Sequence, residues 1–511
     1  MAHHEPAKLA GEDARNVMKL ALCLKAGFTC SGYRERQGGI FQHSSASRLA
    51  YLSNQSKALE AVELPNRLPQ DFPDVHIETC ALNAFFQHFT DVSRDPTVSR
   101  GYLDGLEDLV RRANPDAHVH QACKVMALAC LGSRLNISAL LVQARSLYIQ
   151  LLHPFSKSLL EISTQDVMES LVTAVLLGLY ELLTAGFTNP SDHDAHSRGV
   201  TAILCATDSP LELVRGRGLF QLAHSLWRNG SNHTFEFGLL PSTQTIRSSS
   251  QPMQRGDEAQ LPDASQGSSL TDPEFNHTRL YRLLKRAETL LLSQHALSED
   301  VNELLAEAYL WDRDLARWPA SRPYEPARAS KAECETQGQC PPWWPPKADT
   351  YFDLYVAATW NTYRKNRLLL LNVIVQCLEK LQEKDAHRRK QAEAAELARD
   401  IMASIPFHLT YASDSLRQVP SHNIGGITVG KTIGGMLLMY PLCVASNLPI
   451  LPAQLRAHMR ECLAWIGEHM AIGQASVFSS TSVTFPADSI VHGYVLLWAG
   501  MLIRPEYQPM P

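Results

Sequence analysis

Apolar residues recur three and four positions apart in segment after segment of the chain, whereas strand-like alternation of apolar and polar residues is rare. Such spacing places apolar side chains on one face of a helix, where they can be buried together. The sequence therefore predicts an all-α, multi-helix fold. Helices are predicted around Leu82, Phe85, Phe86 and Phe89, around Tyr102, Leu103, Leu106 and Val110, and over residues 123–131, 140–152, 167–183 and 199–205.

Two segments interrupt the helical pattern. Residues 241–274 are polar, rich in serine and without apolar periodicity, which is typical of a disordered loop. Residues 318–349 are rich in proline, which cannot donate the backbone hydrogen bond that a helix needs. This second segment is therefore predicted to be an extended connector, and its paired tryptophans, Trp343 and Trp344, are expected to dock on the helical body.

The overall composition is that of a chain that folds around a core. Of the 511 residues, 45% are hydrophobic and 19% are charged. The formal net charge of -5 gives no basic field that would draw the whole chain to a phosphate backbone. The strongest local basic run is His387-Arg388-Arg389-Lys390, which we interpret as the solvated face of a charged helix rather than a nucleic-acid contact or import signal.

The cysteines favour an intracellular protein. There are eleven, an odd number, and they are scattered along the chain as reduced, buried thiols would be. Cys334 and Cys340 lie in the proline-rich connector and are interpreted as free surface thiols.

No membrane association is expected. The apolar run over residues 171–180 ends at Glu181, and that over residues 436–450 is interrupted by two prolines. Each is too short to cross a bilayer as a helix, which needs roughly 20 apolar residues.

Cys23 and Cys30 form a Cys-x6-Cys pair that is followed by Gly32-Tyr33-Arg34. This stretch resembles the second half of the six-cysteine binuclear zinc cluster of the fungal zinc-cluster transcription factors. In that family two zinc ions share six cysteines, because each ion takes about four thiolates in a tetrahedral array. Here Leu20 stands where the family has a ligand, and residues 1–22 contain no cysteine. Cys23 and Cys30 are therefore interpreted as a vestigial, incomplete set of metal ligands.

The incomplete cluster limits what the resemblance implies for cofactors and DNA. Two thiolates do not complete a structural zinc site, so no cofactor is expected, and zinc only if residues outside this chain complete the cluster. In the family, the DNA contact comes from a Lys/Arg-rich turn between the second and third cysteines, which is missing here. Direct DNA binding by this chain alone is therefore not expected.

The resemblance continues through the helical part of the chain. Trp360-Asn361-Thr362-Tyr363-Arg364 resembles the Trp-Asn-x-x-Arg helix of the family's regulatory region, and residues 400–407 resemble its Asp-Ile-x-x-Ser-x-Pro turn. Because the blocks follow one another in the family's order, we expect the family's helical regulatory domain over most of the chain. The other matching blocks are residues 101–106, 144–148, 196–199, 434–442, 465–466 and 472–475.

Single residues of these blocks are assigned packing roles and no binding role. Trp360, Tyr363 and Arg367 share one helix and are interpreted as core and capping residues. His196 is interpreted as a close helix contact, and His408 as a core histidine with its hydrogen bonds satisfied.

One motif favours an enzyme. Residues 425–432 match the Gly-x4-Gly-Lys-Thr pattern of a phosphate-binding loop. That loop needs a buried strand before it, whereas residues 416–423 include a proline and many polar side chains, so the match is interpreted as coincidental, at the start of a helix. Metal-protease, nucleophile-elbow and dinucleotide motifs are missing from the sequence. The chain is therefore predicted not to be an enzyme.

These segments predict three parts. Residues 1–48 hold the incomplete zinc-cluster remnant and a tail, residues 49–78 form a linker, and residues 79–511 form the helical regulatory domain. The resemblance implies a transcription regulator that acts in the nucleus on a pathway or secondary-metabolite gene set. It would act directly if a complete zinc cluster exists upstream, and otherwise through partners: the transcription machinery, another DNA-binding regulator or a homodimer.

Two other functions stay open at this point. A helical protein-interaction or small-molecule-sensing module without DNA contact is the main alternative, because all-α domains offer apolar clefts between helices. A nucleotide hydrolase is the third.

Overall fold

A computed structural model of the protein describes residues 74–95, 98–159, 167–185, 196, 199–200, 203, 277–293, 297–321, 325–329, 340–411, 423–424, 427–480 and 496–501. Regular structure in this part of the chain is almost entirely helical, which confirms the predicted all-α fold. The predicted loop over residues 241–274 lies outside the described residues, as do the two N-terminal cysteines.

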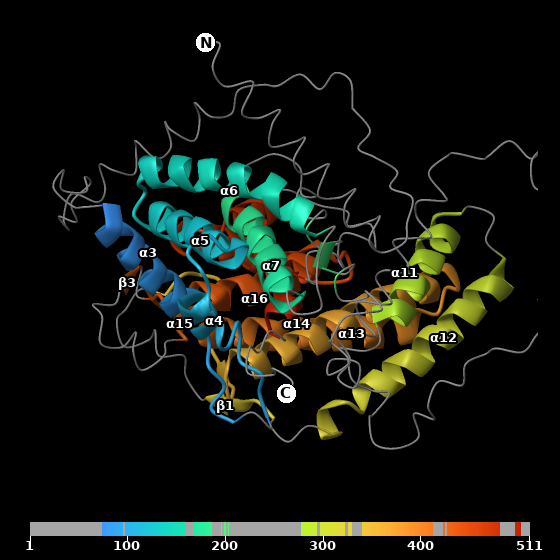
Figure 1. Cartoon of the computed structure of the whole chain (residues 1–511). Helices are drawn as coiled ribbons and strands as arrows, with labels where there is room; N and C mark the ends of the chain where they lie inside the picture. Colours follow the sequence, from blue (N-terminus) through green and yellow to red (C-terminus); the bar gives the residue numbers. More distant parts are fainter. Residues whose placement is uncertain are drawn as a thin grey trace, which may run out of the picture.

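The N-terminal helices form a group around α5 (Figure 1). Phe85 and Phe89 are fully buried and stack with their ring centroids 5.3 Å apart, as the helical spacing of these phenylalanines predicts. The first described helix, α3, begins inside the segment that the sequence analysis treats as a linker. The group consists of α3 (Asp74–Phe89), α4 (Leu106–Arg112), α5 (His118–Arg134), α6 (Ser138–Ser158) and α7 (Val167–Thr184).

The C-terminal helices surround α13 (Leu354–Lys380), whose first turn is capped by the Asp353 side chain accepting from the Val356 amide at 2.9 Å. Helices α11, α12, α14 and α16 pack directly on α13. Contacts of α18 with α7 and of α16 with α3 join the two groups around one continuous apolar core. The group also contains α11 (His277–Leu292), α12 (Ser298–Ala316), α14 (Lys384–Ala403), α15 (Ile405–Thr410), α16 (Thr432–Asn447), α17 (Ala453–His469) and α18 (Gly473–Ser480).

One predicted helix is shorter than expected. Tyr102 and Leu103 precede α4 instead of belonging to it, and Tyr102 pairs with Asp91 through two backbone hydrogen bonds of 2.8 and 2.9 Å. Gly101 and Gly105 have φ angles of 66° and 78°, in the left-handed region that glycine adopts without strain. These two glycines turn the chain so that the apolar side chains of Tyr102 and Leu103 are buried without a helix.

The described parts of the proline-rich connector contain no α-helix, and they contribute two short antiparallel strands. A 3-10 turn, η1 (Pro319–Ser321), precedes β1 (Ala327–Ala329), which pairs with β2 (Ala348–Thr350). Trp343 docks on the helical body at 5% exposure, with its ring centroid 5.9 Å from that of Trp465. A second hairpin of two-residue strands joins β3 (Asn423–Ile424) to β4 (Ile427–Thr428).

The described cysteines correct one prediction. Cys123, Cys130, Cys377, Cys443 and Cys462 are free and buried, and Cys80 is free and exposed. Cys334 and Cys340 were both predicted as free surface thiols. Cys340 is disulfide-bonded, and Cys334 lies outside the described residues.

Within the described ranges, none of the helices combines the length and the apolar character that crossing a bilayer requires.

Candidate functional site

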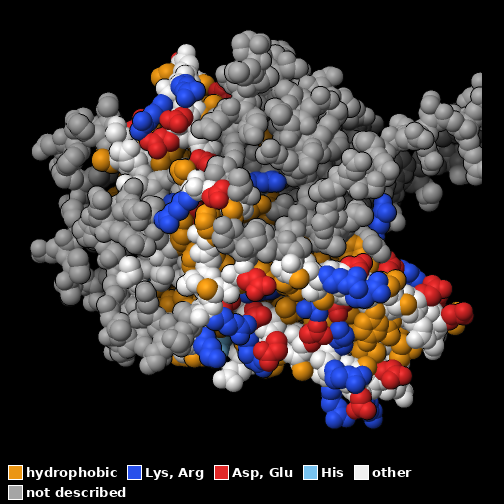
Figure 2. Space-filling model, turned by 90° about the horizontal axis from the view of Figure 1, so that it is seen from below, with side chains coloured by type: hydrophobic (Ala, Val, Ile, Leu, Met, Phe, Trp, Pro, Cys, Tyr) orange, Lys and Arg blue, Asp and Glu red, His pale blue; other side chains and the backbone are white. Residues whose placement is uncertain are grey.

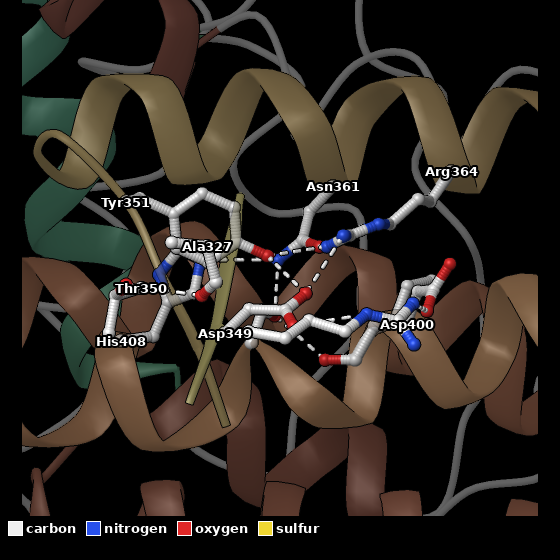
Figure 3. A network of polar contacts seen from close by, with 11 residues as sticks. Ala327, Asp349, Thr350, Tyr351, Asn361, Arg364, Asp400 and His408 are labelled. Carbon is white, nitrogen blue, oxygen red and sulfur yellow. Dashed lines mark hydrogen bonds and ion pairs between the residues drawn. The ribbon is translucent and has the colours of Figure 1, made fainter. Parts of the chain in front are cut away.

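The two sequence blocks that resemble the fungal regulatory region meet in space (Figure 3). Asn361, on α13, donates a hydrogen bond of 2.8 Å from Nδ2 to the Ser404 hydroxyl, which lies between α14 and α15. Both residues are fully buried. The polar positions of the two blocks are therefore parts of one site.

Arg364 extends this site to the connector. One turn after Asn361, its guanidinium donates to Asp349 Oδ2 at 3.1 Å, to the Tyr351 hydroxyl at 2.6 Å and to Asn361 Oδ1 at 3.0 Å. Asp349 lies on β2, and both charged partners are at most 4% exposed. Burial alone would lower the pKa of Arg364, but Tyr351, Asp400 and Asp349 raise it above its ordinary value. The arginine is thus a permanent buried cation that holds the hairpin against α13.

His408 completes the site, and its protonation follows from the hydrogen bonds. Because a guanidinium can only donate, Arg364 fixes the Asn361 amide with its oxygen toward the arginine. The amide nitrogen then faces His408 Nε2 at 3.1 Å, so this ring nitrogen must accept. Burial lowers the pKa of His408 to about 3, and the charge of Arg364 acts in the same direction. The imidazole is therefore neutral, with its proton on Nδ1.

Helix α16 approaches this histidine closely. Gly434 packs against the His408 carbonyl oxygen, and a Cβ atom at position 434 would overlap that oxygen. This glycine allows α15 and α16 to pack backbone against backbone.

The site reaches solvent through one pair. Arg328, on β1, donates to Asp400 Oδ1 at 2.6 Å and lies 3.9 Å from the second carboxylate oxygen of Asp349. The side chain of Arg328 is 64% exposed, whereas that of Asp349 is 1% exposed. A chain of polar contacts therefore runs from the surface to the neutral imidazole of His408.

The polar contacts of this site serve to hold secondary-structure elements in place. The arginine is bonded to three partners, the carboxylate of Asp349 faces two arginines, and the histidine is neutral and buried. The site fastens the connector hairpin, α13 and α15 to one another. Asn361 and Arg364 thus add hydrogen bonds to the packing role that was predicted for the helix around Trp360.

The aromatic residues of that block pack as predicted. Trp360 and Tyr363 are 7% and 4% exposed, and both contact the fully buried Trp318, whose ring stacks on Tyr363 at 4.9 Å. His196 is also a buried helix contact: its Nε2 lies 3.0 Å from the Tyr148 hydroxyl, beside Gly178.

A second ionic cluster links α12, α13 and α14. Arg367 donates to Asp312 Oδ1 at 2.8 Å and pairs with Glu393, and Lys390 donates to Asp312 Oδ2 at 2.7 Å and to Glu393 at 2.8 Å. Lys390 belongs to the basic run that was interpreted as a charged helix face. That run does lie on a helix, α14, and Arg388 is 75% exposed, but Lys390 points inward to Asp312.

The Gly-Lys-Thr match lies at a helix start, as the sequence analysis interpreted it. Lys431 directly precedes α16, and the preceding strand β4 is a two-residue element of a hairpin. The Lys431 ammonium donates to the Thr90 carbonyl and to Asp91 Oδ1, both at 2.7 Å, and the residue is 3% exposed. The Lys431 side chain is therefore bound inside the protein, to Asp91 and Thr90, and does not point outward to where a phosphate could bind.

The metal ligands predicted from the sequence, Cys23 and Cys30, lie outside the described residues. Their chemistry does not fit a binuclear zinc cluster, because two thiolates cannot provide the roughly four donors that each zinc ion needs. Among the described residues, no group of three or more potential ligands is placed to hold a metal ion.

Sequence reasoning missed Asp349 and Tyr351, the connector's share of the site. Their strand is three residues long, which is too short for a period-two pattern, and it lies in a proline-rich segment. A usable signal is the alternation of Asp349 and Tyr351 in the few residues before the capping Asp353, where the connector becomes α13.

Comparison with known proteins adds one relative that spans nearly the same length. The chain is 34% identical over 441 residues to the transcription factor dbaG of Emericella nidulans, and the match covers 85% of this chain and 99% of the relative. No protein-family model matches the chain. No solved structure matches it.

Proposed function

The chain belongs to the same family as the transcription factor dbaG, and from this premise we propose that it regulates transcription in the nucleus, on a pathway or secondary-metabolite gene set. The observation that carries the proposal is the similarity over 99% of the relative's length, which is too extensive for a single shared motif. The order of sequence blocks that resemble the fungal regulatory region supports the same assignment.

Partner contacts, rather than direct base contacts by this chain alone, are the proposed route to DNA. The net charge is -5, and Lys/Arg side chains are interspersed with Asp/Glu over the described face shown in Figure 2. Binding through phosphates requires a concentration of positive charge on one face. We assign the helical body to contacts with the transcription machinery or with another DNA-binding regulator.

Rapid depletion of the protein tests the regulatory function. A degron fusion would be removed within one growth phase while transcripts are sequenced and the nuclear fraction is probed for the fusion. We expect a coherent set of pathway transcripts to change, and the fusion to be found in the nucleus. Unchanged transcripts after complete depletion would refute the proposal.

The zinc remnant has a matched test. Cys23→Ser combined with Cys30→Ser should leave zinc content and transcript levels as in the wild type, because two thiolates hold no binuclear cluster. Cys80→Ser, which alters an exposed free thiol on α3, is the control. About two zinc ions per chain, lost in the double variant together with sequence-selective duplex binding, would replace the partner-dependent route with direct recognition.

A further inference from the structure

Arg134, the last residue of α5, is half-buried and is bonded to two uncharged groups. Its Nη1 donates to His88 Nδ1, on α3, at 3.1 Å and to the hydroxyl of Thr432, the first residue of α16, at 3.4 Å. Because a guanidinium can only donate, His88 Nδ1 must accept, and the imidazole is therefore neutral. Three helices thus meet at a cation that has only neutral partners among the described residues.

The electrostatics of Arg134 differ from those of an arginine that is paired with carboxylates. Burial lowers the pKa of Arg134, and the group that opposes this effect is the Cys130 thiol. Burial acts in the same direction on Arg367, but there Asp312 and its neighbours raise the pKa above its ordinary value. A cation that loses water without gaining a counter-charge costs free energy, and a bound anion would remove that cost.

The neighbouring segments do not supply the missing negative charge. Residues 117–160, which include α5 and α6, contain no aspartate or glutamate. Asp91, which follows α3, is bonded to Lys431. Thr432 lies at the N-terminal end of α16, where no side chain caps the helix and where the helix dipole is positive. The helix end therefore adds to the positive potential at Arg134 and does not balance it.

One edge of the Arg134 guanidinium is left for a ligand. Both bonds of this side chain are made by Nη1. Nε and Nη2 bond no atom of the described residues, and neither is among the atoms that are sealed from solvent without a partner. The two nitrogens form the side of a guanidinium that can donate two parallel hydrogen bonds to one carboxylate.

We propose that the Nε–Nη2 edge of Arg134 binds a carboxylate group, carried by a small organic acid or by an acidic side chain of a partner. A carboxylate matches the single charge and the flat two-donor edge of one guanidinium, whereas a phosphate brings more negative charge than one guanidinium balances. The inference goes beyond the proposed function, because it gives the helical body a ligand site. A ligand at Arg134 would strengthen the contact between the N-terminal helices α3 and α5 and helix α16 of the C-terminal group.

Chemical modification of the full wild-type chain tests the site directly. Phenylglyoxal reacts with accessible guanidinium groups, and peptide mass spectrometry gives the reaction rate at each arginine. When sodium acetate replaces sodium chloride at equal ionic strength, the rate at Arg134 should fall, by about threefold once acetate reaches about twice its dissociation constant. Arg145, an exposed arginine of α6, is the control and should react at the same rate in both salts. No reaction at Arg134 in chloride, no protection by acetate, or equal protection of Arg145 overturns the proposal.

Variants separate binding at Arg134 from general effects of salt. Salts also change stability by exclusion from the protein surface, so the difference between proteins is what counts. Acetate should raise the melting temperature of the wild type and of Arg145→Gln above the value in chloride, and should not do so for Arg134→Gln. Arg134→Lys keeps the charge without the two-donor edge and should show a smaller rise. An equal rise in Arg134→Gln and the wild type overturns the proposal. Sodium phosphate that protects Arg134 from phenylglyoxal where acetate does not overturns the carboxylate in favour of a phosphate.

Small molecules released by denaturing the protein purified from its own cells distinguish the two sources of the carboxylate. An organic acid released in stoichiometric amount from the wild type, and not from Arg134→Gln, assigns the site to a small molecule. Protection by acetate without such an acid assigns it to an aspartate or glutamate of a partner. Equal release from both proteins places the acid elsewhere and overturns a small-molecule ligand at Arg134. None of these measurements uses transcript levels, so this site and the proposed function can fail separately.

Discussion

Arg364 and Arg286 each join two segments through carboxylates, but in opposite environments. Arg364 is 4% exposed and bonds Asp349, which is 1% exposed, between α13 and the connector hairpin. The side chain of Arg286 is 42% exposed and bonds Glu303 at 3.0 Å and Glu307 at 3.2 Å, between α11 and α12. Distance does not separate the two, because the arginine–carboxylate contacts are all between 3.0 and 3.2 Å.

Burial makes the difference between them. Water screens the exposed pairs, so their net contribution to stability is small. In the buried pair both charges have lost their water, so removal of one partner leaves the other charge uncompensated. The buried polar contacts of Arg364 thus stabilise one arrangement of the connector, α13 and α15, whereas the exposed α11–α12 pairs tolerate change.

Arg364→Met should have the largest effect. The substitution leaves Asp349 buried without its main partner and removes hydrogen bonds to Tyr351 and Asn361, so the free energy of unfolding should fall by about 3–5 kcal/mol. Urea denaturation followed by circular dichroism measures the loss.

A second variant makes this test specific for the pair. Adding Asp349→Leu to Arg364→Met removes the stranded charge and should recover part of the loss. A loss below about 1 kcal/mol for Arg364→Met alone would show that this buried pair contributes no more to stability than the exposed ones.

Lys431→Met should be next, at about 3 kcal/mol near neutral pH, because Lys431 is the bonded cation of buried Asp91. Burial already raises the pKa of Asp91, against the opposing effect of Lys431, and it also raises that of nearby Asp353. Without the lysine the folded state should bind protons still more readily than the unfolded state. The variant should therefore regain stability, relative to the wild type, as the pH falls toward the carboxylate range.

Thermal denaturation of Lys431→Met and the wild type across pH, each with and without magnesium nucleotide, checks this prediction. We expect the deficit of the variant to shrink at acidic pH and nucleotide to have no effect. A nucleotide-dependent rise in the wild-type melting temperature that Lys431→Met abolishes would restore the phosphate-binding interpretation of the Gly-Lys-Thr match.

His408 should contribute a smaller, pH-dependent effect. Its pKa is lowered from 6.5 to about 3 by burial, so as the pH falls below 6.5 the unfolded state takes up a proton that the folded state refuses. Stability carried by the neutral imidazole is present above pH 6.5 and decreases below it, by about 2 kcal/mol between pH 7 and pH 5.

The difference between the wild type and His408→Gln isolates this contribution, because the raised carboxylate pKa values act in both proteins. Urea midpoints of the two proteins should converge as the pH falls from 7 to 5. Parallel pH profiles would show that the histidine is not held neutral by the site.

The sequence predicts the helices of both regions better than it predicts their charged partners. Spacing alone places Phe85 and Phe89 on one helix, and the Trp360 block on another. Asp349 could not be found, because its partner Arg364 lies 15 residues further on and the intervening chain turns from a short strand into a helix. The sequence predicted a helix at Tyr102 because an apolar residue looks the same whether it is buried in a helix or in a loop. Here the positive φ angles of the neighbouring glycines set the course of the backbone, and apolar periodicity does not reveal them.

Arg286→Ala, which removes the exposed pairs, should have the smallest effect. The guanidinium bonds two glutamates whose side chains are 65% and 36% exposed, so its removal should lower the free energy of unfolding by less than about 1 kcal/mol. Salt at molar concentration should remove even this difference in stability, because the Debye length at that ionic strength is about 3 Å. The loss caused by Arg364→Met should persist under the same conditions, because water and ions do not reach a pair that is at most 4% exposed. If salt instead removed both losses equally, exposure would not be what separates the two arginines, and the polar site would have to be regarded as another surface contact.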